Sequence, residues 1–135
     1  FNVYGFNEGH KGDQASPFTK FTDQAIENGT VKVFKGSENF KRDFVCVEDV
    51  CKVHEKLFDV RENGIYNVGT GNAVSFRDVA ETVAKVYDST VEEIPMPTIL
   101  QGQYQEYTCA NTEKLFANIE VEFKDIRDYI YENIK

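Results

Sequence analysis

The sequence predicts an α/β fold, because short apolar strands alternate with amphipathic helices along its 135 residues. A second observation is the capping signature Ser75 to Asp78, which introduces the most clearly periodic helix. A third is the pair of turn signals Asn28-Gly29 and Asn63-Gly64, which separate elements. A chain of this length is sized for one domain with one core. We expect short, unequal strands and about four or five helices.

The first elements follow from strand propensity and from residues that begin and end helices. Ser16 can cap a helix whose first position is Pro17, and Asn28-Gly29 ends it. We expect, in order, a strand at residues 1–4, a helix at 17–28, a half-exposed strand at 31–34, a turn at 36–39, and a strand at 44–47 close to the one at 31–34.

The later elements follow mainly from hydrophobic periodicity. A helix from Val47 has one face with Val50, Val53, His54, Leu57 and Phe58, and Asn63-Gly64 stops it. We then expect a strand at 65–68, a helix with the buried stripe Phe76, Val79, Ala80, Val83, Ala84 and Tyr87, a strand at 91–94, a loop to Tyr107, a short helix capped by Asn111 with Leu115, Phe116 and Ile119, and a last helix with Ile126, Tyr129, Ile130 and Ile134.

Charge and cysteine content exclude several classes of function. With 15 Lys and Arg against 23 Asp and Glu, the net charge of -8 argues against nucleic acid or an anionic membrane as a partner. The three cysteines show no C-x-x-C spacing, so we expect reduced thiols in the cytoplasm and no metal site. His54 is expected to be a packed residue, and Gly69-Thr70-Gly71 is either a phosphate loop or, as we prefer, a tight turn.

The chain opens inside an apolar, strand-like segment, without an initiator Met or a signal peptide. It also contains no complete G-x-G-x-x-G fingerprint. We therefore expect residues 1–135 to form one domain of a longer enzyme, whose N-terminal dinucleotide-binding part is absent. The opening strand should then be unstable or paired anew, with aggregation or dimerisation through its edge.

Four segments resemble the ADP-L-glycero-D-manno-heptose 6-epimerase family, within the extended short-chain dehydrogenase/reductase superfamily. They are Phe1-Asn2-Val3-Tyr4-Gly5, Glu8-Gly9-His10-Lys11-Gly12, residues 34–45 (FKGSENFKRDFV) and Tyr66-Asn67-Val68-Gly69-Thr70-Gly71. The resemblance implies a Rossmann-type α/β enzyme, of which this chain is the C-terminal, substrate-binding region. The missing N-terminal part would be the NADP-binding Rossmann part.

The resemblance also implies an activity. The family is a group of cytoplasmic, NADP-dependent isomerases that invert C6 of the heptose in ADP-heptose by transient oxidation and reduction, for the lipopolysaccharide inner core. The parent would be a homo-oligomer that binds an ADP-sugar, and this chain alone would be inactive. Two alternatives stay open: another nucleotide-sugar epimerase or dehydratase, or a nucleotide-sugar-binding module without catalysis.

Site residues are carried over from the resemblance by position. Lys11 would be an acid/base beside sugar and cofactor, which requires its pKa to fall from about 10.4 toward the working pH. Val3 and Lys11 would contact the cofactor. The substrate-binding residues would be Asn2, Asp13, Lys20, Phe34, Lys35, Gly36, Ser37, Arg42 and Tyr104.

Each of these roles has a plainer alternative. Asp13 and Lys20 stand where the family commonly has a serine and a histidine. Lys11 could be a solvated loop lysine, and Tyr104 an exposed loop tyrosine. Arg42, expected to bind the diphosphate, could instead form a structural ion pair with Asp43 or Asp49.

Overall fold

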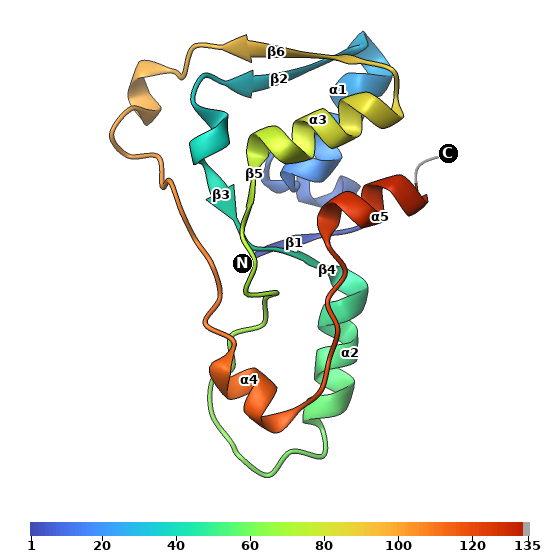
Figure 1. Cartoon of the computed structure of the whole chain (residues 1–135), viewed down its shortest axis with the longest axis vertical. Helices are drawn as coiled ribbons and strands as arrows, with labels where there is room; N and C mark the ends of the chain where they lie inside the picture. Colours follow the sequence, from blue (N-terminus) through green and yellow to red (C-terminus); the bar gives the residue numbers. More distant parts are fainter. Residues whose placement is uncertain (134–135) are drawn as a thin grey trace.

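The computed structural model describes residues 1–133. Two groups of helices lie on either side of the short parallel strand pair formed by residues 2–4 and 44–46 (Figure 1). In chain order the elements are β1 (Asn2–Tyr4), the 3₁₀ segment η1 (Gly9–Gln14), α1 (Pro17–Asn28), β2 (Thr30–Phe34), η2 (Ser37–Asn39), β3 (Lys41–Arg42), β4 (Phe44–Cys46), α2 (Val47–Leu57), β5 (Val74–Ser75), α3 (Phe76–Val86), β6 (Thr90–Ile94), η3 (Thr98–Leu100), α4 (Glu113–Asn118) and α5 (Ile126–Asn133). The α/β class predicted from the sequence is confirmed.

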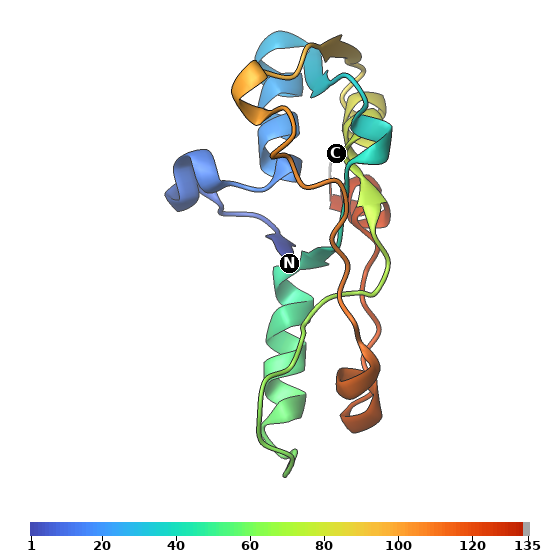
Figure 2. The ribbon, with the colours of Figure 1, turned by 90° about the vertical axis from the view of Figure 1, so that its left-hand side faces the viewer.

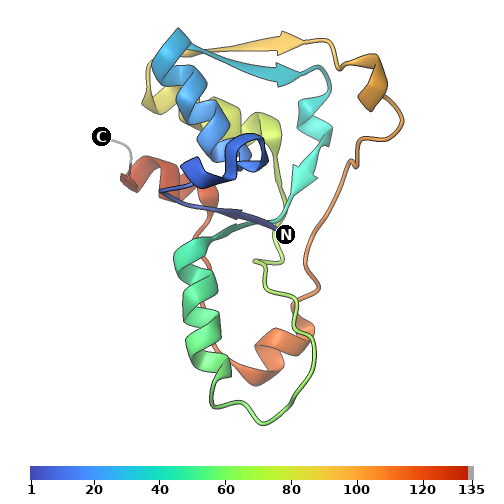
Figure 3. The same ribbon diagram turned by 180° about the vertical axis from the view of Figure 1, so that it is seen from behind.

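The larger lobe is built on the parallel pair β2–β6, which runs in register from Thr30 opposite Thr90 to Phe34 opposite Ile94. Helices α1 and α3 pack against this pair and against each other, and α5 packs on α3 (Figure 3). Their apolar faces form one core with Tyr4, Phe18, Phe44, Val79, Val83 and Ile130 among its buried residues. The main core therefore lies between the strand pair and the helices.

The smaller lobe contains α2 and α4, with extended segments that connect them to the larger lobe (Figure 1). Its separate hydrophobic cluster is centred on the buried residues Val53, Leu115 and Ile119. Between the lobes, β1 pairs in parallel with β4, with Asn2 opposite Phe44. Figure 2 shows η1 projecting from the body of the fold beside this junction.

The starts of α1 and α3, predicted from their capping residues, are confirmed, whereas α4 has Thr112 and not the predicted Asn111 at its cap position. Ser16 Oγ accepts a hydrogen bond from the Thr19 N–H at the start of α1, and Ser75 Oγ accepts one from the Asp78 N–H at the start of α3. Each serine accepts a hydrogen bond from a backbone N–H in the first turn that has no partner within the helix. Gly29 ends α1 with φ at 64°, a backbone conformation that glycine adopts without a steric penalty.

Some predictions about α2 and the segment after it were wrong. Helix α2 begins at Val47, as predicted, so the strand before it ends one residue earlier than expected, and α2 ends at Leu57, before the predicted Asn63-Gly64 stop. Phe58, expected on the buried face, is 90% exposed. Residues 65–68 form no strand within the described chain, because no neighbouring strand pairs with them and Ile65 is 88% exposed.

The strands at 31–34 and 44–46 do not pair with each other, since β2 pairs with β6 and β4 with β1. The buried stripe of α3 is confirmed at Val79, Ala80, Val83 and Ala84. Ile134, predicted to lie on the last helix, is outside the described residues. Within residues 1–133, no helix combines the length and the apolar character needed to cross a membrane.

Candidate functional site

A cavity of about 350 Å³ opens on the larger lobe, where α1, β2, η2, α3 and the loop after β6 meet. Its volume falls in the lower part of the range of small-molecule sites, about 300–1,000 Å³. The lining residues are mostly apolar or aromatic, with a few polar groups. They are Pro17, Lys20, Phe21, Gln24, Lys32, Val33, Phe34, Ser37, Phe40, Phe76, Ile94 and Tyr104.

Aromatic rings form one wall of this cavity. The Tyr104 ring lies edge-on to Phe40, with centroids 4.9 Å apart, and also contacts Phe34 and Phe76 at 6.1 and 6.2 Å. Burial raises the pKa of Tyr104, and nearby Arg42 offsets part of this effect, so the hydroxyl is protonated near neutral pH. An apolar, aromatic wall of this kind suits a flat heteroaromatic ring.

Arg42 covers the aromatic wall. Its guanidinium carbon lies 5.1 Å from the centroid of the Phe76 ring and 5.5 Å from that of Tyr104. Its Nη1 donates to the Lys41 carbonyl at 2.9 Å, and its Nη2 donates to the Gln105 carbonyl at 2.5 Å. These bonds use two of the five N–H groups of a guanidinium, so others remain available to an anion.

Cationic and hydroxyl groups complete the cavity. Lys20 and Lys32 line it, which gives a local positive charge on an acidic chain. The hydroxyl of Ser37 is buried and has no hydrogen-bond partner among the described residues. A buried polar atom without a partner carries a free-energy cost that a ligand atom could relieve. Gly36, just before it, has φ at 88°, which favours glycine at this turn.

A second polar cluster surrounds the buried carboxylate of Glu8. Lys11 Nζ lies 2.8 Å from Glu8 Oε1 and 3.3 Å from the Val3 carbonyl. Ser16 donates to the same carboxylate through its N–H at 3.0 Å and its hydroxyl at 2.6 Å, and Thr19 Oγ1 donates at 2.5 Å. The cluster holds the η1 segment between β1 and the start of α1.

The structure therefore distributes the predicted site residues over two places. The cavity brings together Lys20, Phe34, Ser37 and Tyr104, with Arg42 above its aromatic wall, and Lys35 and Gly36 lie in the turn between Phe34 and Ser37. Asn2, Val3 and Lys11 lie at β1 and η1. Asp13 connects the two places, because its carbonyl accepts a hydrogen bond from Lys20 Nζ at 2.6 Å.

Sequence reasoning missed several residues of these places. Phe40 lies in the quoted segment 34–45 but was given no role, and Phe76 was assigned only to the helix stripe. Glu8 was noted only as part of a polar segment, although its spacing of three residues from Lys11 is a signal for an ion pair. Among the residues that the structure describes, the alternative ion pair between Arg42 and Asp43 is not formed. The Arg42 guanidinium donates its hydrogen bonds to backbone carbonyls, and the Asp43 carboxylate accepts hydrogen bonds from other segments, such as Thr70.

The fit to a nicotinamide cofactor is limited to one edge of the chain. Val3 is half-buried in β1, and the Lys11 ammonium lies against its carbonyl, so these two residues could border a nicotinamide ring. Pyrophosphate recognition of the Rossmann type needs a Gly-rich turn between a strand and a helix. No group of three or more His, Cys, Asp or Glu side chains is arranged to hold a metal ion among residues 1–133.

Several solved structures of nucleotide-sugar enzymes are similar to this chain in overall fold. An ADP-L-glycero-D-manno-heptose-6-epimerase from Helicobacter pylori is 28% identical with a TM-score of 0.84, over 98% of this chain and 40% of that one. A UDP-glucose 4-epimerase from Thermus thermophilus, in complex with NAD, is 25% identical with a TM-score of 0.73, over 98% and 45%. A UDP-glucose 4-epimerase from Thermotoga maritima, with UDP-glucose, is 21% identical with a TM-score of 0.80, over 98% of this chain and 42% of that one. At this identity, the similarity is one of fold only.

This chain spans about two fifths of the length of these structures. Residues 1–69, just over half of the chain, match the family described as NAD dependent epimerase/dehydratase. The matched segment contains β1, η1, β2, β3 and β4, and therefore Lys11, Arg42 and the Glu8 cluster. The chain belongs to the NAD dependent epimerase/dehydratase family.

Proposed function

We propose that this chain is the substrate-binding region of a nicotinamide-dependent enzyme that inverts C6 of ADP-glycero-manno-heptose. The observation that carries the proposal is the aromatic cavity with Arg42 above it. Phe34, Phe40 and Tyr104 would enclose the base, and the guanidinium would bind the diphosphate through paired, charge-assisted hydrogen bonds. Family membership supports the same class of ligand.

The sugar would lie between Arg42 and β1. Asn2 is opposite Phe44 in the parallel pair, and its N–H donates to the Asp43 carbonyl at 3.0 Å. The beginning of β1 is therefore next to Asp43, the residue that follows Arg42. A diphosphate at Arg42 would direct the attached sugar toward this end of the fold, where Asn2 could hydrogen-bond its hydroxyls.

Lys11 is the proposed acid/base at the sugar. It is half-buried, and its Glu8 partner fixes the ammonium beside the Val3 carbonyl. When bound at this edge, NADP would supply a reversible hydride acceptor, which side chains cannot provide. Lys11, which Glu8 holds as an ammonium, would donate a hydrogen bond or its proton to the sugar oxygen, and Val3 would orient the nicotinamide ring.

ADP-heptose is preferred among nucleotide sugars for two reasons. The Helicobacter pylori epimerase is 28% identical over nearly the whole chain. Residues 8–12 and 34–45 also resemble the heptose epimerases more narrowly than the superfamily in general. The proposal includes a cytoplasmic location, a role in lipopolysaccharide precursor synthesis, and a homo-oligomeric parent. It also assigns NADP binding mainly to an N-terminal part outside these residues, so residues 1–135 alone should not turn over.

Two measurements test this function. The full-length protein, supplied with NADP and either C6 epimer of ADP-heptose, should produce the other epimer, followed by NMR of the sugar protons. Turnover of a different nucleotide sugar only, or no turnover with nucleotide-sugar binding retained, would support the alternatives instead. Turnover by residues 1–135 alone would contradict the assignment of the cofactor site.

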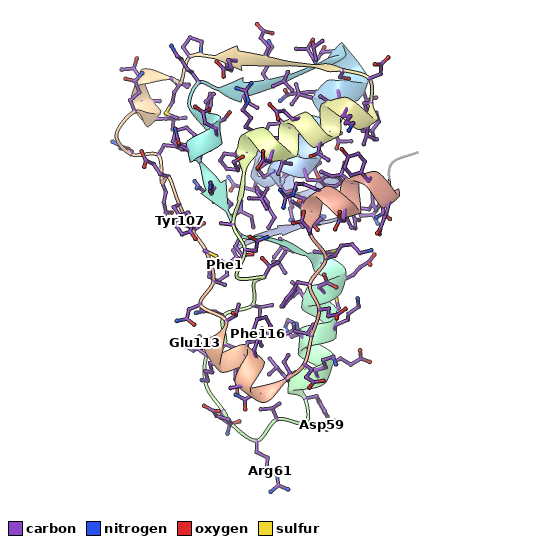
Figure 4. All side chains as sticks on the ribbon, viewed as in Figure 1. Phe1, Asp59, Arg61, Tyr107, Glu113 and Phe116 are labelled. Carbon is purple, nitrogen blue, oxygen red and sulfur yellow. The ribbon has the colours of Figure 1, made fainter. Side chains whose placement is uncertain are left out.

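Ligand binding by the chain itself gives the second measurement. Calorimetry should detect ADP binding, and Arg42→Lys should weaken it about tenfold, because an ammonium lacks the planar pair of donors. Arg61→Lys is the matched control, since Arg61 extends from the far end of the smaller lobe (Figure 4). Equal effects of the two substitutions would refute Arg42 as the diphosphate ligand, and tighter binding of UDP than ADP would overturn the adenine nucleotide assignment.

A further inference from the structure

Asp43 carries a fully buried carboxylate that the proposed chemistry does not use. Its Oδ1 accepts from the Thr70 N–H at 2.9 Å and the Thr70 hydroxyl at 2.7 Å. Its Oδ2 accepts from the N–H groups of Gly71 at 2.9 Å and Ala110 at 3.1 Å, with the Cys109 thiol at 3.8 Å. One side chain therefore joins three chain segments that are far apart in sequence.

Gly69, just before the turn that binds Asp43, packs closely against Ala110 and Asp43. A Cβ placed on Gly69 would lie 2.6 Å from Ala110 Cβ and 2.8 Å from Asp43 Oδ2. Real Cβ atoms do not make contacts this short, so Gly69 packs against both neighbours more closely than a residue with a side chain could. The carboxylate thus holds the residues 109–110 in one position relative to the turn at 69–71.

The segment fixed by Asp43 is the one that holds Arg42. The Lys41 N–H donates to the Glu106 carbonyl at 2.8 Å, and the Thr108 N–H donates to the Lys41 carbonyl at 3.2 Å. The Gln105 carbonyl from the same segment accepts from Arg42 Nη2. Figure 4 shows Tyr107 of this segment on the extended chain that runs beside β3.

We propose that Asp43 is a positioning residue, which places the guanidinium of Arg42 against the Phe76 and Tyr104 rings of the cavity wall by anchoring residues 105–110. The proposal rests on the proposed function, because it assigns Arg42 to a nucleoside diphosphate. Asp43 does not touch the ligand. Its carboxylate fixes the backbone of Ala110, and this also fixes the position of the connected segment from Gln105 to Ala110. The Gln105 carbonyl in that segment then orients the guanidinium.

The test compares ADP with adenosine, since only ADP has phosphates to meet Arg42. In Asp43→Asn, an NH₂ group replaces one acceptor oxygen and opposes the N–H donors. ADP affinity should fall about tenfold, a loss of the size expected for one charge-assisted interaction, while adenosine affinity measured by NMR titration stays within about twofold. The Arg42 Nε–H resonance should also shift in the free protein.

Asp49→Asn is the matched control. Asp49 is also buried, and its carboxylate accepts from Lys52 Nζ at 3.0 Å and the Lys124 N–H at 2.8 Å, on the side of α2. It should lower stability without changing the ADP to adenosine affinity ratio. If Asp43→Asn does not fold, Thr70→Val removes one donor hydroxyl to the same carboxylate and should weaken ADP binding about threefold.

The outcomes separate this inference from the proposed function. Wild-type chain that fails to bind ADP refutes the proposed function and the role of Asp43 with it. ADP binding that depends on Arg42 but is unchanged in folded Asp43→Asn, with an unshifted Arg42 resonance, refutes the positioning role alone. Equal losses for ADP and adenosine would assign Asp43 to general stability and also overturn the inference.

Discussion

Replacing Glu8 with glutamine should destabilise this chain strongly, because one carboxylate holds the η1 segment to the rest of the fold. Glu8 is 5% exposed and accepts hydrogen bonds from Lys11, Ser16 and Thr19. Glutamine has the same shape but keeps only one acceptor oxygen. Its NH₂ group would face donors, and the Lys11 ammonium would lose its counter-charge.

The pKa of Glu8 gives the size of the effect. Burial by itself would raise this pKa, but the hydrogen bonds from Lys11, Ser16 and Thr19 outweigh it and lower the pKa from 4.5 to about 2. The shift corresponds to about 3 kcal/mol of unfolding free energy at neutral pH. Because the folded pKa is depressed, this stabilisation is complete above about pH 4.5 and is lost as the pH falls through about 2.

Urea unfolding at several pH values provides the assay. We expect Glu8→Gln to lower the unfolding free energy by about 2–3 kcal/mol at pH 7, and the difference from wild type to shrink below about pH 4.5. Glu27→Gln, at an exposed position of α1, should change it by less than about 0.5 kcal/mol. A difference for Glu8→Gln that is below about 1 kcal/mol at pH 7, or that does not depend on pH, would refute the reasoning.

Two further substitutions test packing by thermal or urea unfolding. Gly69→Ala should destabilise by about 1–3 kcal/mol, since its Cβ would lie 2.6 Å from Ala110 Cβ, whereas Gly9→Ala has open space and should be nearly neutral; equal effects would contradict the close contact. Leu115→Ala should cost about 2–5 kcal/mol because Leu115 is fully buried in the smaller core, and a cost as small as that of Phe58→Ala would mean that this core contributes little.

The parts of the fold that the sequence predicted well are those determined by neighbouring residues. The caps Ser16 and Ser75 act on N–H groups three residues away, and both helices begin where these residues indicate. The stripe of α3 is equally local, because its period places Val79 and Val83 on one face. Such features need no knowledge of the tertiary structure.

Strand pairing was less predictable because it depends on distant segments. Residues 65–68 have strand propensity, but they have no paired strand within the described chain, and Ile65 is exposed. Strand β2 finds its partner in β6, some sixty residues later, and not in the nearby β4. Strand propensity identifies a segment that can pair, whereas the identity of its partner strand depends on how the helices between the two strands pack.

Some residues of the candidate site could likewise be predicted from the sequence, and others could not. Arg42 and Tyr104 were assigned through a resemblance in short segments, and the structure places them in contact although sixty residues separate them. Glu8 and Asp43 were missed, because most of their partners are hydroxyl and backbone N–H groups from several segments. Backbone donors carry no residue identity, so no sequence pattern reveals that they surround Asp43, whereas Glu8 has a signal in its spacing from Lys11.

The position of Asp43 explains why a costly buried charge can be useful here. The two lobes have separate hydrophobic clusters, and the turn at 69–71 and the residues 109–110 both run between them. Apolar contacts have little directional preference, so they alone would not fix how these two segments lie relative to each other. Hydrogen bonds to one carboxylate fix the distance and the angle between the segments. Hydrogen bonds to a charged group contribute about 1.5–3 kcal/mol each, so several of them can offset the loss of hydration. A residue that joins the lobes in this way also determines where the chain beside Arg42 must lie.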